Sequence, residues 1–144
     1  KKVFVGNKGE YIIVKAPELQ SEAILKGPVM VIPLGDDLYK VGASYGRDDY
    51  SSHTTSGACE EISAKLSKMI SCDFKVVDQV TGIRPTVKDR KPLVGCLQNT
   101  KSVSFLNGLG TRGLTMAPCL AGHLYDYLEN DVQIPELIDI KRFA

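Results

Sequence analysis

The chain has 144 residues, a length that suits a single globular domain with one hydrophobic core. Its residues are 43% hydrophobic and 24% charged, as in ordinary globular proteins, and its formal net charge is +1. Lys and Arg are spread along the chain without a basic stripe, so the sequence gives no strong signal for nucleic-acid binding. The longest apolar runs are too short for a helix that spans a bilayer.

The first third of the chain predicts three strands. Residues 6–9 (GNKG) predict a turn that leads into a short strand over Glu10–Lys15. An apolar run covers Pro28–Leu34, and a strand with a two-residue apolar period returns over Leu38–Tyr45. Between them, residues 35–37 (GDD) predict a hairpin turn.

The rest of the chain predicts two helices and three strands. The polar stretches 16–26 and 46–55 predict connections. The apolar spacing and capping residues predict helices over Thr54–Ile70 and Leu114–Glu129. Further strands are expected over Phe74–Ile83, Lys91–Leu97 and Val103–Asn107, and the tail 132–144 reads as irregular.

This order of elements predicts an α+β fold with a mostly antiparallel sheet covered by helices. We expect the sheet to contain Glu10–Lys15, Pro28–Leu34, Leu38–Tyr45 and Phe74–Ile83. The helix Thr54–Ile70 should cover one face of this sheet, because its apolar stripe must be buried against another element.

The four cysteines are widely spaced and, with only two histidines in the chain, form no metal-binding signature. We expect no metal site and interpret the cysteines as buried free thiols. Free thiols are typical of the reducing cytoplasm, so we predict a cytoplasmic location. The cysteines are Cys59, Cys72, Cys96 and Cys119.

One motif, residues 81–95 (TGIRPTVKDRKPLVG), places Arg84 in a segment that Pro85 stiffens. The planar fork of an arginine pairs with a carboxylate through two hydrogen bonds, so Arg84 is a candidate carboxylate anchor. Composition alone favours a surface arginine paired with a nearby acid, and the motif around Arg84 reverses this preference.

A second motif, residues 107–118 (NGLGTRGLTMAP), is a glycine-rich turn from an apolar strand into a helix. Such a turn directs backbone N–H groups at whatever precedes the helix, where the helix dipole favours negative charge. Residues 108–113 fit the letters of GxGxxG, but no second strand with an acidic ribose partner follows them. The alternative is an ordinary strand-to-helix turn that uses glycine for positive φ.

Together with the segments GPVMVIP (27–33) and VGASY (41–45), the two motifs resemble a known family. They look like the C-terminal half of D-amino-acid-oxidase-like (glycine oxidase-like) FAD-dependent oxidoreductases, and the resemblance runs over residues 9–143. It implies a substrate-binding region at 1–100 and the last strand, turn and helix of the FAD domain at 101–144. The family's N-terminal GxGxxG region has no counterpart here, so we expect a domain fragment that does not retain FAD.

The resemblance also implies roles for particular residues. Arg84 would hold a substrate carboxylate. Tyr45 and Tyr50 are candidate aromatic walls of a substrate site that the resemblance itself does not assign. The backbone N–H groups of residues 112–115 would face the flavin N1 and O2 atoms, where negative charge grows on reduction. The residues implied in cofactor binding are Gly108, Gly110, Thr111, Arg112, Gly113, Leu114 and Thr115.

One position departs from the family's pattern, and no catalytic residue is identified. D-amino acid oxidases of the family have a tyrosine over the substrate where this chain has Val29. The resemblance therefore does not carry over that substrate pocket.

The family's activity implies oxidation of the CH–NH bond of an amino acid or secondary amine by hydride transfer to flavin. Two alternatives stay open: the oxidase part of an enzyme that modifies tRNA wobble uridine, and a ligand-binding module without catalysis. We expect the isolated fragment to be inactive. An apolar face left bare on the fragment would favour a homodimer.

Overall fold

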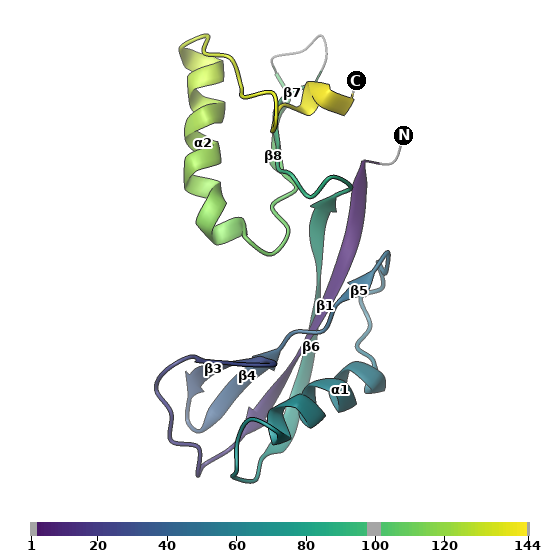
Figure 1. Ribbon diagram of the computed structural model, residues 1–144, viewed down its shortest axis with the longest axis vertical. Coiled ribbons are helices and arrows are strands. Elements are labelled where there is room, and N and C mark those ends of the chain that lie inside the picture. The colour runs from purple at the N-terminus through teal and green to yellow at the C-terminus, as the bar shows by residue number, and fades with distance from the viewer. Residues whose placement is uncertain (1–2, 98–101, 144) are drawn as a thin grey trace. The chain divides into compact units, whose positions relative to one another are not determined.

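The computed structural model describes residues 3–97 and 102–143 (Figure 1). The chain forms two compact units: unit 1 contains Lys1–Asn7 and Arg84–Ala144, and unit 2 contains Lys8–Ile83. Two long strands, β1 (Phe4–Lys15) and β6 (Lys75–Val87), have residues in both units. The assignment of residues 1–100 to a substrate region and 101–144 to a cofactor region stays a prediction.

The sheet is built from six strands in the order β2-β3-β4-β1-β5, with β6 paired to β1. Strands β2 and β3, β3 and β4, and β1 and β4 pair antiparallel, which confirms the predicted α+β class and mostly antiparallel sheet. The remaining strands are β2 (Leu25–Lys26), β3 (Met30–Gly35), β4 (Leu38–Gly42) and β5 (Gly46–Arg47).

Helix α1 (Ser56–Ser67) covers one face of this sheet, as its apolar stripe predicts (Figure 1). Ile62 and Leu66 are fully buried against alternate residues of the strands, because side chains of a strand alternate between its two faces. This core comprises Ile12, Val14, Ala16, Val29, Val31, Tyr39, Val41, Ile62 and Leu66.

The predicted hairpin joins β3 to β4. Asp36 and Asp37 have φ values of 51° and 60°, the backbone of a type I′ turn, whose twist matches that of the flanking strands. Strand β4 ends at Gly42, where a Cβ atom would lie 2.5 Å from the ring atom Cδ1 of Tyr11. Only glycine therefore fits at this position, where β4 pairs with β1.

Some boundaries differ from the sequence predictions. The predicted turn at residues 6–9 is wrong, because these residues lie inside β1, which pairs with β4, β5 and β6. Ladder hydrogen bonds along a strand outweigh the local turn preference of Gly and Asn. The predicted connections at 16–26 and 46–55 contain the short strands β2 and β5.

Unit 1 contains a second, smaller hairpin and a helix. Strands β7 (Leu93–Cys96) and β8 (Ser104–Asn107) pair antiparallel, and α2 (Gly113–Glu129) packs on them. Its core comprises Val94, Leu120, Ile134 and Ile138.

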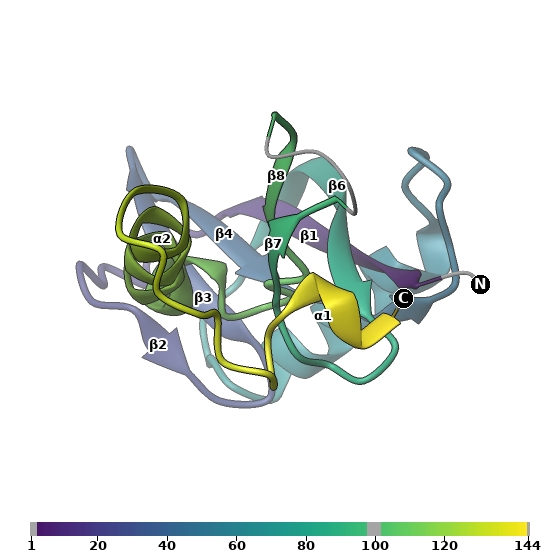
Figure 2. The ribbon, with the colours of Figure 1, turned by 90° about the horizontal axis from the view of Figure 1, so that it is seen from above.

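The C-terminal tail is held to this core. It runs beside β7 (Figure 2), and the Val94 N–H donates to the Ile138 carbonyl at 2.9 Å. The tail ends in a 3-10 helix, η1 (Ile140–Phe143). Ile134 and Ile138 are buried, whereas Leu137 is exposed.

The four cysteines are free thiols. Cys96 is buried, but Cys119 lies on the exposed side of α2, so the expectation of buried thiols is wrong for Cys119. None of the helices in the described residues is long and apolar enough to cross a membrane.

Candidate functional site

The two sequence motifs meet in unit 1. The Gly110 N–H donates to the carbonyl of Pro85 at 3.2 Å, which joins the glycine-rich turn to the segment that carries Arg84. Arg84 directly precedes Pro85 on β6 and is half-buried. The candidate carboxylate anchor and the candidate anion-binding turn are therefore neighbours along this hydrogen bond.

The turn depends on glycine at Gly108. This residue has a φ of +71° and is buried, and a Cβ atom there would lie 2.5 Å from Cγ2 of Val87. Its N–H donates to the side-chain oxygen of Asn107 at 2.7 Å. Gly110 follows with a φ of +55°. These values fix a sharp turn between β8 and α2.

Helix α2 begins directly after this turn, at Gly113, with Arg112 as its N-cap. The Arg112 N–H already donates to the Leu109 carbonyl at 3.1 Å, and no side chain caps the helix at Arg112. The amides of Gly113, Leu114 and Thr115 are first-turn N–H groups, which have no acceptor within a helix.

These observations fit an electron-rich group such as the pyrimidine edge of a flavin. Leu114 is 98% exposed, so the first turn of α2 is not covered by the described residues. Uncapped amides at a helix N-terminus favour negative charge. Gly113 is half-buried, whereas Leu114, Thr115, Thr111 and Arg112 are exposed, and their role in cofactor binding stays a prediction. The Arg112 N–H already donates to the Leu109 carbonyl, so the predicted contact between this N–H and the flavin would compete with that hydrogen bond.

The two candidate aromatic walls belong to unit 2, on either side of β5. Tyr45 is 70% exposed and Tyr50 is 46% exposed. Their role in substrate binding stays a prediction. Val29 is buried in the core beneath α1, so its side chain is not open to a ligand.

A buried cluster of charged residues in unit 2 was missed by the sequence reasoning. Lys8 is 2% exposed, and its Nζ lies 2.9 Å from Ser51 Oγ, 3.2 Å from Asp49 Oδ2 and 3.4 Å from Glu10 Oε1. Glu10, 3% exposed, accepts from the Thr55 N–H at 2.7 Å and from the Thr55 hydroxyl at 3.0 Å. The signal available in the sequence was the spacing of Lys8 and Glu10, which puts both on one face of a strand.

The ionisation of this cluster follows from its contacts. Burial lowers the pKa of Lys8, but the carboxylates of Asp49 and Glu10 outweigh it and raise the pKa above its ordinary value. Burial raises the pKa of Glu10, but hydrogen bonds from Thr55 and Lys8 bring it below its ordinary value. The Ser51 N–H and hydroxyl, followed by Lys8, lower the pKa of Asp49. All three groups are therefore charged at neutral pH.

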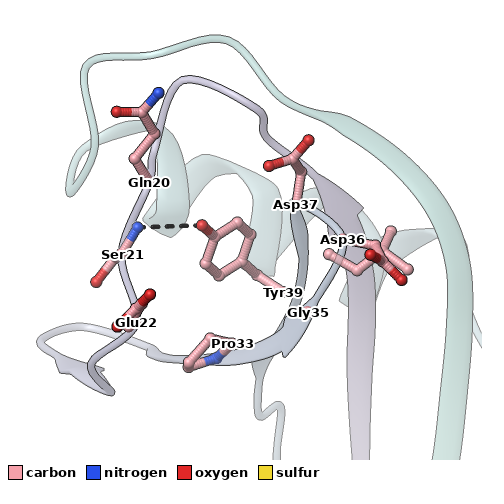
Figure 3. Close-up of a pocket in the computed structure, with 9 residues that line it drawn as sticks. Gln20, Ser21, Glu22, Pro33, Gly35, Asp36, Asp37 and Tyr39 are labelled. Atoms are coloured by element: carbon pink, nitrogen blue, oxygen red, sulfur yellow. Dashed lines mark hydrogen bonds between the residues drawn. The ribbon is translucent and has the colours of Figure 1, made fainter.

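A cavity of about 410 Å³ lies at the turn of the β3–β4 hairpin (Figure 3). The ring of Tyr39 lines it, and the Tyr39 hydroxyl accepts from the Ser21 N–H at 3.2 Å. None of the predicted site residues lines this cavity. Its other lining residues are Gln20, Ser21, Glu22, Pro33, Gly35, Asp36, Asp37 and Leu38.

Solved structures share this fold. Glycine oxidase from Geobacillus kaustophilus is 18% identical, with a TM-score of 0.74 over 95% of this chain and 39% of its own. Glycine oxidase from Bacillus cereus ATCC 14579 is 16% identical, with a TM-score of 0.71 over 90% of this chain and 36% of its own. Iminodiacetate oxidase from Chelativorans sp. BNC1 is 20% identical, with a TM-score of 0.75 over 96% of this chain and 40% of its own.

The chain thus spans two fifths or less of the length of these solved structures. A family model described as FAD dependent oxidoreductase matches residues 2–127, most of the chain. The chain belongs to the FAD-dependent oxidoreductase family.

Proposed function

We propose that the chain is the substrate-binding and C-terminal part of a longer FAD-dependent oxidoreductase that oxidises the CH–NH bond of an amino acid or secondary amine. The observation that carries this proposal is the hydrogen bond from the Gly110 N–H to the Pro85 carbonyl. This hydrogen bond connects two segments. One carries an arginine that can pair with a carboxylate, and the other is the start of a helix, which favours an electron-rich ring. The free thiols agree with a cytoplasmic location.

The chain's own residues would bind and orient the substrate. Arg84 pairs with the substrate carboxylate, and Pro85 limits the backbone around it, so that the fork is held in one place. FAD, when bound, supplies the acceptor for the hydride that leaves the CH–NH carbon, and the resulting imine is hydrolysed by water.

The substrate class is supported by the solved relatives as well. Their names specify glycine and iminodiacetate as substrates, and both molecules carry a carboxylate beside an amine nitrogen. A single arginine near the flavin-facing turn would recognise the part that the two molecules share.

The test replaces Arg84 in the full-length flavoprotein. Arg84→Ala should raise KM for glycine or iminodiacetate, because a charge-assisted pair of hydrogen bonds is lost. The loss of binding free energy should be about 2–4 kcal/mol. Arg84→Lys should recover only part of this, since an ammonium cannot form the fork. Steady-state oxidation of both amines gives KM and kcat.

Arg90→Ala is the matched control. Arg90 lies in the exposed loop after β6, so this variant removes the same charge a few residues away and should leave KM unchanged. Unchanged KM in Arg84→Ala would refute the carboxylate assignment and make a plain amine the better substrate class.

A further inference from the structure

The cavity at the turn of the β3–β4 hairpin lies wholly in unit 2 and has no part in the proposed function. All of its lining residues belong to Lys8–Ile83. Its volume of about 410 Å³ falls in the range of small-molecule sites, which is about 300–1,000 Å³. We call it the hairpin cavity.

Two hydrogen bonds attach the segment that follows β1, residues 16–21, to the hairpin. The Ala16 N–H donates to the Asp37 carbonyl at 2.9 Å, and the Ser21 N–H donates to the Tyr39 hydroxyl at 3.2 Å. Tyr39 is 4% exposed and belongs to the core beneath α1. The shape of the hairpin cavity is therefore defined by these hydrogen bonds and by the core.

The Tyr39 side chain lines the hairpin cavity, and its hydroxyl has an unused proton (Figure 3). A tyrosine hydroxyl can both accept and donate a hydrogen bond. The Tyr39 oxygen accepts from Ser21, whereas its proton has no acceptor among the described residues. Polar groups of buried side chains normally have partners, so this proton indicates an acceptor that comes from the cavity.

The hairpin cavity is also negatively charged. Glu22, Asp36 and Asp37 line it, and no described lysine or arginine does. In the described part of the chain, none of these three carboxylates forms an ion pair. They are too far apart to share a metal ion, since residues 3–97 and 102–143 contain no group of side chains that could hold one. Separated carboxylates around a cavity suit an organic cation better than a metal ion.

We propose that the hairpin cavity binds a small amino alcohol, a molecule with one ammonium group and one hydroxyl group. The ammonium pairs with the carboxylates of Glu22 and Asp37, and the oxygen of the ligand accepts the unused proton of Tyr39. An ammonium has donors only and cannot accept that proton, so the ligand needs an oxygen as well. None of the lining residues is Arg84 or belongs to the glycine-rich turn, and the site does not depend on the proposed function.

The first measurement compares three probes of the same length on the full-length flavoprotein. Ethanolamine has both groups, ethylamine lacks the hydroxyl, and ethylene glycol lacks the charge. An NMR titration at low ionic strength detects weak binding and limits the screening of the carboxylates. We expect ethanolamine to bind about fivefold more tightly than ethylamine, and ethylene glycol to bind more weakly than either. Equal affinities of ethanolamine and ethylamine would overturn the proposal.

The second measurement assigns the two groups of the ligand to residues of the cavity. Tyr39→Phe keeps the ring and removes the hydroxyl, so it should weaken ethanolamine about fivefold and leave ethylamine unchanged. Glu22→Gln should weaken both amines about twofold to threefold, because an exposed carboxylate pairs weakly with an ammonium. Glu18→Gln is the matched control, since Glu18 is exposed and does not line the cavity, and it should change neither affinity. An equal loss of both amines in Tyr39→Phe would contradict the hydroxyl contact and overturn the proposal.

A third comparison separates the hairpin cavity from the substrate site. Ethanolamine has no carboxylate, so Arg84→Ala should leave its affinity unchanged, whereas the same variant tests the proposed function through KM for glycine. An ethanolamine affinity that falls in Arg84→Ala but not in Tyr39→Phe would place the amine at the substrate site and overturn the proposal. If Tyr39→Phe does not fold, Glu22→Gln combined with Asp37→Asn should abolish the preference for ethanolamine over ethylene glycol; a preference that persists would overturn the proposal.

Discussion

Gly108 is the residue on which the candidate cofactor turn depends most directly. Its φ of +71° is costly for any residue with a Cβ atom, and that atom would overlap Val87. We predict that Gly108→Ala lowers the free energy of unfolding by about 2–4 kcal/mol, as strain and overpacking add. Urea unfolding measures this difference.

Gly122→Ala is the matched control for this prediction. Gly122 is exposed on α2, and a Cβ atom there would meet no atom within 4 Å. This variant should therefore raise the free energy of unfolding by about 0.5–1 kcal/mol, because alanine favours a helix. Equal effects of the two substitutions would contradict the steric argument.

Asp89 and Arg142 form a second residue-scale interaction, at the C-terminal end of unit 1. Arg142 Nε lies 2.8 Å from Asp89 Oδ2, and the guanidinium also donates to the carbonyls of Lys91 and Asp139. The hydrogen bonds that Asp89 accepts from Arg142, and then from the Lys91 N–H, lower its pKa below the ordinary value of 3.8, although partial burial opposes them. The pair fixes η1 to the loop between β6 and β7.

This pKa shift predicts the pH dependence of stability. A carboxyl group whose pKa is lowered by folding stabilises the protein above its unfolded pKa of 3.8, and this contribution is lost as pH falls through the folded value. Asp89→Asn should therefore cost about 1 kcal/mol at about pH 7, and less at about pH 3. Urea unfolding of both proteins across this range tests it; a constant difference would show that the ion pair contributes nothing. Glu10 and Asp49 also have lowered pKa values, but they are present in both proteins and cancel in the difference.

At the scale of elements, the sequence predicts best where local and tertiary preferences agree. Helix α1 has an apolar stripe and a threonine cap, and both are used, since Ile62 and Leu66 are buried and Thr55 caps the helix. The β3–β4 hairpin has two aspartates that tolerate positive φ at its turn. These two elements and the antiparallel sheet were predictable for these reasons.

Where the two preferences disagree, the sequence misleads. Residues 6–9 have turn composition, yet they continue β1, where Lys8 contacts Glu10 on the same strand and Asp49 and Ser51 from the loop after β5. Strands β2 and β5 have two residues each and carry no periodic signal. Such short strands are defined by their partners, which the sequence alone does not reveal.

At the scale of the whole molecule, the features that the sequence predicted and the buried cluster that it missed belong to different units. Unit 1 contains the first motif from Arg84 onward and the whole of the second, and the hydrogen bond between Gly110 and Pro85 connects them. Their local backbone was predictable because proline restricts φ and glycine permits the positive φ that a sharp turn needs. The buried ion pair of Lys8 and Glu10 depends on residues up to 69 positions away, a separation that no local pattern predicts.

The 144-residue chain alone should not retain the cofactor. A flavin dinucleotide is held mainly through its pyrophosphate and ribose, which need an early strand, a GxGxxG turn and an acidic partner. The described residues offer only the turn at 108–115 and the uncapped start of α2. We therefore expect the purified chain to be colourless and its thermal midpoint to be unchanged by added FAD. Binding would be detected in this assay, because a ligand present at 100 times its Kd adds about 2.7 kcal/mol to the free energy of unfolding.

The full-length flavoprotein is the positive control in this experiment and should be yellow and stabilised by FAD. Gel filtration of the isolated chain should show a dimer, because Leu114 and Tyr125 are 98% and 62% exposed on α2 and large exposed apolar side chains favour association. Tyr125→Lys should restore the monomer by placing a charge on this face. Stoichiometric flavin on the isolated chain would contradict the prediction, and would mean that the turn at 108–115 binds the cofactor without a dinucleotide-binding region.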